Sequence, residues 1–110
     1  MPKEDFLKQL QSDYIATFQE KMTAIKGAFT ARQWVTLAQI FHKLAGSGAT
    51  YSMPEITEIS REIETYLQSC QTPSMAFLEE SISTLDKIFK CREKGESFDL
   101  SHVDFIKGRR

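Results

Sequence analysis

The spacing of apolar residues along the chain predicts helices. Apolar side chains recur every three or four positions, as they do along one face of an amphipathic helix. The first such segment, residues 3–27, carries its stripe from Phe6 to Ile25, and Gly27 is expected to end it. The intervening members of this stripe are Leu10, Tyr14, Phe18 and Met22.

Capping patterns mark the start of two further helices. Thr30 followed by Gln33 has the spacing of a capping box, in which two side chains bind backbone N–H groups reciprocally. Ser52 and Glu55 have the same spacing ahead of a third helix, about residues 53–70. The apolar stripes are Trp34, Leu37, Phe41 and Leu44 in the second helix and Ile56, Ile59, Ile63, Leu67 and Cys70 in the third.

A fourth helix completes the predicted fold. Thr72 and Pro73 are expected to open it, and its stripe is Met75, Leu78, Ile82, Leu85 and Phe89. Short connections between four amphipathic helices predict an all-α fold, an antiparallel up-down four-helix bundle. We assign residues 1–95 to this bundle. Residues 96–110 lack a sustained apolar period, so they are expected to form a C-terminal extension, a docking segment or a linker.

Composition and charge narrow the class of protein. The 110 residues are 41% hydrophobic and 26% charged, as expected for one soluble domain. The 14 Lys and Arg residues balance 15 Asp and Glu residues, which argues against nucleic-acid binding and against a polybasic membrane patch. No apolar run is long enough to predict a membrane-spanning helix or a secretory signal, so we expect a cytoplasmic protein. No feature of the sequence requires an oligomer, so we expect a monomer. Cys70 and Cys91 lack metal-site spacing and are expected to be reduced thiols.

The stretch FHKLAGSGAT, residues 41–50, places two glycines in a predicted helix after a histidine. Each helical glycine costs about 1 kcal/mol relative to alanine, so both need a reason. Successive helical residues are about 100° apart, so His42, next to core-facing Phe41, should lie at the edge of the core face and reach solvent. Gly46, four residues later, lies beside His42 and leaves room for another protein. Gly48 returns to the core face, where it lets a neighbouring helix pack closely.

Several functions remain possible for this stretch. The segment GSGAT lacks the Gly-Lys-Ser/Thr ending of a phosphate-binding loop and follows a helix rather than a strand, which argues against nucleotide binding. A general-base role for His42 is not favoured, because no paired carboxylate or nucleophile lies one turn away. A helical adaptor or scaffold that binds a partner without covalent chemistry remains open.

The motif HKLAGSG at residues 42–48, with YSM at 51–53 and Ile56 after it, resembles the signature of histidine phosphotransfer (HPt) domains. These domains act in the multistep phosphorelays of two-component signalling. The resemblance implies that His42 is the phospho-acceptor. It would exchange a phosphoryl group with the aspartate of a response-regulator receiver domain or with a hybrid sensor histidine kinase. The chain would then be a carrier and not an enzyme, or a degenerate HPt domain that only docks a receiver.

The same resemblance suggests roles for the neighbours of His42. It implies phosphate or partner contacts around the ring, from Gln39, Lys43, Gly46 and Ser47. Glu64, which lies 22 residues after the histidine, matches a glutamate that hydrogen-bonds the imidazole in chemotaxis-kinase phosphotransfer domains. No metal or other cofactor is expected in this chain, since the magnesium ion of these relays is held by the receiver.

Two positions depart from the family pattern. Ala45 stands where the family usually has a lysine, so phosphate contacts should be weaker, with Lys43 a partial substitute. Ser52 stands where the family usually has a glycine, and we expect it to replace one helix-ending device with another.

Overall fold

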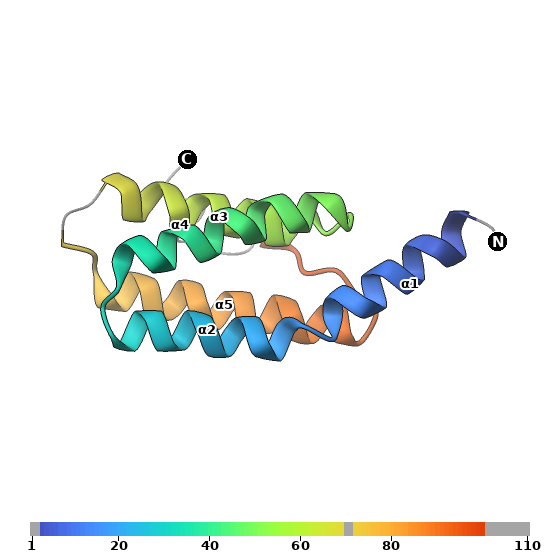
Figure 1. Ribbon diagram of the computed structural model, residues 1–110, viewed down its shortest axis with the longest axis horizontal. Coiled ribbons are helices and arrows are strands. Elements are labelled where there is room, and N and C mark those ends of the chain that lie inside the picture. The colour runs from blue at the N-terminus through green and yellow to red at the C-terminus, as the bar shows by residue number, and fades with distance from the viewer. Residues whose placement is uncertain (1–2, 70–71, 101–110) are drawn as a thin grey trace.

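The computed structural model describes residues 3–69 and 72–100, and every regular element in this part is helical. The helices are α1 (Lys3–Ile15), α2 (Phe18–Thr30), α3 (Trp34–Thr50), α4 (Pro54–Ser69) and α5 (Met75–Glu93). Helices α2 to α5 run alternately up and down side by side, whereas α1 extends beyond one end of them (Figure 1). The predicted all-α, up-down four-helix bundle is therefore confirmed. None of the described helices combines the length and apolar character needed to cross a membrane.

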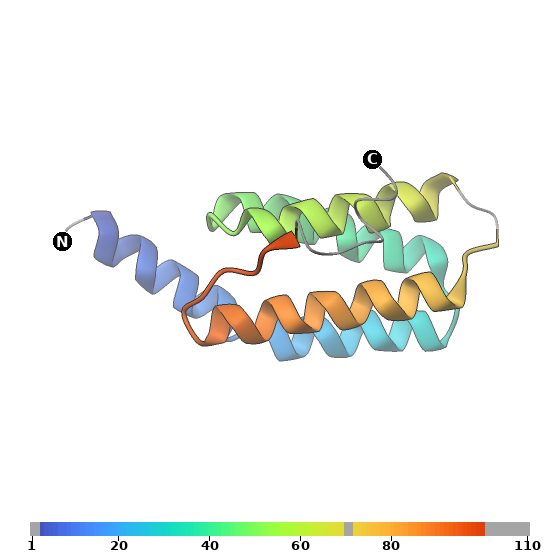
Figure 2. The same ribbon diagram turned by 180° about the vertical axis from the view of Figure 1, so that it is seen from behind.

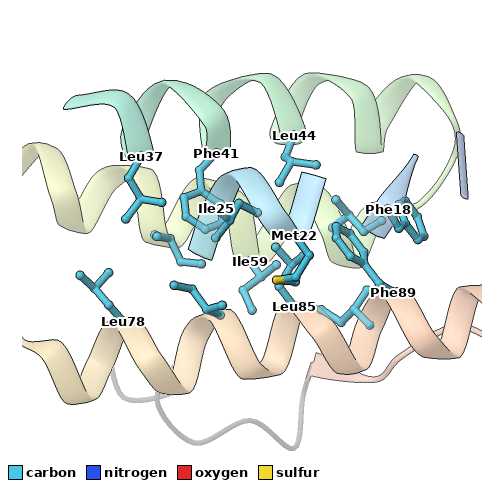
Figure 3. Packing of buried hydrophobic residues seen from close by; sticks show 14 of the residues in the cluster. Phe18, Met22, Ile25, Leu37, Phe41, Leu44, Ile59, Leu78, Leu85 and Phe89 are labelled. Carbon is cyan, nitrogen blue, oxygen red and sulfur yellow. The ribbon is translucent and has the colours of Figure 1, made fainter. Parts of the chain in front are cut away.

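The hydrophobic core lies between the four bundle helices. Figure 3 shows side chains from all four pointing toward one another, with Phe41 of α3 and Ile25 of α2 both fully buried. The rings of Phe18 and Phe89 stack with their centroids 4.0 Å apart and join α2 to α5. Each such side chain stabilises the fold by about 1.5–3 kcal/mol through removal from water, so the predicted stripes account for the association of the helices.

The prediction of one helix over residues 3–27 is wrong in two respects. The segment forms two helices, and the second of them ends later than predicted. A turn at residues 16–17 divides it into α1 and α2. Thr17 Oγ1 donates a 2.6 Å hydrogen bond to the carbonyl of Tyr14, a contact that lets a hydroxyl compete with regular helical bonding. Beyond this turn α1 leaves the bundle, and Phe6 is 58% exposed. Gly27 is an exposed residue inside α2, which continues to Thr30.

Helices α2, α3 and α5 end in the same way. The second residue after each helix end has a left-handed backbone, and the N–H of the residue that follows it bonds to a carbonyl five residues earlier. These left-handed residues are Arg32 (φ 56°), Ser52 (φ 60°) and Gly95 (φ 81°). Ser52 therefore ends α3 and does not cap α4. The capping box expected at Thr30 and Gln33 is also absent, since Thr30 belongs to α2 and Gln33 makes no side-chain cap bond.

Helix α5 begins two residues later than the sequence predicts. Ser74, not Thr72, is its N-cap, because the Ser74 hydroxyl accepts a hydrogen bond from the N–H of Phe77. The N–H of Ser74 itself donates to the Tyr66 hydroxyl at 2.6 Å. Pro73 thus lies in the connection before the helix.

Glu55 does not complete a cap but forms a buried ion pair across the bundle. Arg92 donates to its two carboxylate oxygens, from Nε at 2.6 Å and from Nη2 at 2.7 Å. The N–H of Phe98 donates to the same carboxylate at 3.3 Å. Burial alone raises the pKa of Glu55, but these hydrogen bonds and the charge of Arg92 outweigh burial and hold the pKa below its ordinary value.

The ion pair also holds the first part of the C-terminal segment. Figure 2 shows this segment turning back from the end of α5 toward α4. Phe98 is partly buried, and Leu100 is only 6% exposed within the core cluster. Cys91 is a free thiol, whereas Cys70 and the rest of the predicted extension, residues 101–110, lie outside the described residues.

Replacing Ser52 with glycine should stabilise the protein. A non-glycine residue is sterically destabilised in the left-handed region, and glycine avoids this clash. Glycine loses more conformational entropy on folding, so the net increase in the free energy of unfolding is about 0.5 to 1 kcal/mol. Urea unfolding of Ser52→Gly measures this gain. The control Ser52→Ala keeps the steric cost and should not be stabilised. A Ser52→Gly protein less stable than the wild type would contradict this account.

Replacing Glu55 with glutamine should lower the free energy of unfolding at pH 7 by about 3 kcal/mol, because Arg92 then keeps an uncompensated buried charge. The wild-type contribution is fully present above the pKa of an unfolded glutamate, about 4.3, and is lost as the pH falls through the lower folded pKa. Urea unfolding between pH 7 and pH 3 should therefore show a smaller acid-induced loss for Glu55→Gln than for the wild type. Identical pH profiles of the two proteins would exclude this role.

Candidate functional site

The site is built around His42 on the outer edge of α3. Phe41, the preceding residue, is fully buried, and its side chain points into the core in Figure 3. The next position along the helix is rotated by about 100° and therefore lies at the core boundary. The side chain of His42 is 75% exposed, which confirms that it reaches solvent.

Glu64 on α4 holds one nitrogen of the His42 ring. Its Oε2 lies 2.9 Å from His42 Nδ1, and its side chain is only 17% exposed. A carboxylate only accepts hydrogen bonds, so Nδ1 carries the hydrogen in this arrangement. In the neutral ring Nε2 then keeps its lone pair and acts as the nucleophilic nitrogen. The contact between Glu64 and His42 proposed from the sequence is present.

A groove between α3 and α4 runs beside the histidine. Its walls include the apolar side chains of Trp34, Val35 and Leu67, together with the predicted contact residues Gln39 and Lys43. Val35 is 75% exposed and therefore presents an apolar side chain to solvent at this groove. The structure thus brings His42, Gln39, Lys43 and Glu64 together at one apolar-walled surface.

The two glycines of α3 have different surroundings, as predicted. A Cβ atom added to Gly46 would meet nothing within 4 Å, so the surface beside His42 is open there. A Cβ atom added to Gly48 would lie 2.6 Å from Thr57 Oγ1 and 2.9 Å from Thr57 N. Gly48 is therefore required by the contact with α4, whereas the fold itself does not require Gly46.

Ser47 is not brought into this groove. Its Oγ lies 2.6 Å from the hydroxyl of Tyr14 and connects α3 to α1. Burial raises the pKa of Tyr14, an effect that the hydrogen bond with Ser47 partly offsets. The rings of Tyr14 and Tyr51 also stack with centroids 4.4 Å apart. Ser47 therefore contributes to the attachment of α1.

Ala45, at the usual lysine position, is buried and only 5% exposed. Its carbonyl accepts a 2.7 Å hydrogen bond from Thr57 Oγ1. Of the described residues that line the groove, Lys43 is the only lysine or arginine. Within residues 3–69 and 72–100, no cluster of three or more His, Cys, Asp or Glu residues could hold a metal ion.

Two residues near the site were not predicted from the sequence. Gln68 Nε2 donates to Glu64 Oε2 at 3.3 Å, the same oxygen that faces His42. Its position four residues after Glu64 was a usable signal, because such pairs share a helix face. The Thr57 contact had no such signal, since it depends on how α3 and α4 are aligned.

One comparison with known proteins identifies a family. The model of the family described as the Hpt domain matches residues 9–90, which include both His42 and Glu64. No curated protein and no solved structure matches the chain significantly.

Alanine substitutions at Gly46 and Gly48 should change the free energy of unfolding in opposite directions. Gly46→Ala should raise the free energy of unfolding by about 1 kcal/mol, because alanine is the better helix former and the added methyl group is unobstructed. Gly48→Ala should lower it, because the methyl group forces α3 and α4 apart. Urea unfolding of both proteins measures these changes. Equal effects of the two substitutions would contradict the different surroundings described above.

Proposed function

Because the chain belongs to the Hpt domain family, we propose that it carries a phosphoryl group on His42 in a two-component phosphorelay. The observation that supports this most directly is the exposed ring whose Nδ1 is held by Glu64. Such a ring presents Nε2 to an approaching partner. The partner proposed is the receiver domain of a response regulator, or a hybrid sensor histidine kinase, which gives or takes the phosphoryl group.

The proposed transfer needs only an oriented imidazole from this chain. The Nε2 lone pair attacks the phosphorus of the receiver's aspartyl phosphate, and a nitrogen–phosphorus bond forms. The aspartate oxygen–phosphorus bond breaks, and its electron pair leaves with the carboxylate. The ring keeps its Nδ1 hydrogen and becomes positively charged, while the carboxylate of Glu64, 2.9 Å from Nδ1, compensates that charge. The reverse step returns the group to another aspartate.

The surface around the ring supports docking of a receiver. Gly46 leaves open space beside His42, and the exposed Val35 gives the partner an apolar contact. Gln39 and Lys43 line the same groove and are proposed to contact the phosphoryl group or the partner. The phosphate contact predicted for Ser47 stays a prediction, since the Ser47 hydroxyl is hydrogen-bonded to that of Tyr14.

The partner is proposed to supply the remaining chemistry. Phosphoryl transfer depends on charge neutralisation, which the magnesium ion of a receiver provides. This chain is then a carrier and not an autonomous catalyst, and it works as a monomer with no cofactor of its own. It would act in the cytoplasm, the location expected from the sequence, where it meets receivers.

Ala45 favours one alternative function. Without the usual lysine beside the phosphoryl group, the domain has less positive charge to stabilise it. The alternative is a degenerate phosphotransfer domain, or a helical adaptor, that binds a receiver without accepting phosphate. The two functions differ in a measurable covalent product.

Incubation of the protein with a panel of phosphorylated receiver domains and a hybrid kinase tests the proposal. Mass spectrometry under non-acidic conditions should find an acid-labile phosphate on His42, and Nε2 is the expected nitrogen. The label should be lost in His42→Gln. Receiver binding without any label, unchanged in His42→Gln, would replace the carrier function with the adaptor function.

Gly46→Gln provides the test of docking in the same experiment. The longer side chain occupies the open surface beside His42, so labelling by receivers should fall while the fold remains intact. Labelling by phosphoramidate, a donor too small to need that surface, should be unchanged. Unfolding of Gly46→Gln would show that the open space is structural.

A further inference from the structure

We propose that Thr57 and Gly48 are positioning residues that align Glu64 with the ring of His42. Neither residue touches the imidazole. This inference rests on the proposed phosphotransfer function, in which Glu64 holds Nδ1, and it assigns a purpose to a close contact between α3 and α4.

The contact joins the two helices almost backbone to backbone. Thr57 is 8% exposed, and its Oγ1 donates a 2.7 Å hydrogen bond to the carbonyl of Ala45. At Gly48 even a methyl group would approach the Thr57 backbone nitrogen to 2.9 Å. The atom nearest to such a methyl group would be Thr57 Oγ1, at 2.6 Å, and its hydrogen bond to the Ala45 carbonyl holds it in place. This hydrogen bond has one partner on each helix. The two helices are therefore fixed in both separation and axial alignment at this point.

Helix geometry carries this alignment to the site. Glu64 lies seven residues after Thr57, close to two turns, so the two residues share a face of α4. Ala45 lies three residues after His42, about one turn along α3. A displacement of α4 at Thr57 therefore moves Glu64 relative to His42. The 2.9 Å contact weakens once the atoms are more than about 3.5 Å apart, so a shift below 1 Å matters.

Glu64 has little freedom to compensate for such a shift. Its side chain is only 17% exposed, and Gln68 donates to the same oxygen that faces Nδ1. The position of the α4 backbone consequently decides whether the carboxylate reaches the ring. When the contact is lost, the hydrogen is free to move to Nε2, which removes the nucleophilic lone pair.

Thr57→Val tests the proposal because valine keeps the shape of threonine and lacks the hydroxyl. The wild-type ring should show the Nδ1–H form in ¹⁵N NMR spectra, and Thr57→Val should shift the population toward Nε2–H. Phosphorylation of His42 by phosphoramidate, which releases ammonia, should slow about tenfold, the factor expected when one hydrogen bond to a charged group is lost. Thr57→Ser keeps the hydroxyl and should behave like the wild type.

Thr84→Val is the matched control. Thr84 is also buried, at 7% exposure, but its Oγ1 donates to the carbonyl of Glu80 within α5. Its replacement should cost similar stability and leave the tautomer and the phosphoramidate rate unchanged. Gly48→Ala, compared with Gly27→Ala at an unobstructed helical position, provides a second pair for the same two measurements.

A wild-type tautomer ratio in folded Thr57→Val would overturn the proposal. Equal changes in Thr57→Val and Thr84→Val would also overturn it, because they would reflect general loss of stability. If the wild type accepts no phosphate from any donor, the proposed function fails, but the tautomer ratios still decide whether Thr57 positions Glu64.

Discussion

The close packing of α3 against α4 determines both the core and the site. Gly48 allows the two backbones to meet, and the apolar faces of the helices close over one another along the remaining turns. With Phe41 buried in the core of the bundle, the adjacent His42 is directed to the outer edge of α3. The exposed ring is thus a geometric consequence of the same packing that stabilises the bundle.

Two glutamates of α4 show how surroundings assign different tasks to one residue type. Glu55 is buried with Arg92, a cation that does not lose its proton, and this pairing joins α4 to α5. Glu64 lies at the surface edge and faces an imidazole, whose charge changes when it gains or loses a proton or a phosphoryl group. A partner of constant charge suits a structural ion pair, whereas a partner whose charge changes suits a functional site.

The periodicity of apolar residues was sufficient to predict the features that depend on a single helix. The core faces, the exposure of His42 and the different surroundings of Gly46 and Gly48 all follow from angular position on α3. Features that join distant residues had no local signal, as with Arg92 for Glu55 and Thr57 for Ala45. The resemblance to a family, and not periodicity, indicated the role of Glu64. The break at Thr17 was missed because the apolar period continues across it.

The left-handed residues Arg32 and Ser52 have a consequence for the motion of α3. They lie in the connections before and after this helix, each only three residues long, at 31–33 and 51–53. Links this short cannot absorb a rotation of the helix about its own axis. A rotation of about 100° that brought His42 to the position of Phe41 would bury the imidazole and move the phenyl ring to the partly buried position of Ile40. The two short connections therefore limit rotation of α3 and keep His42 facing outward.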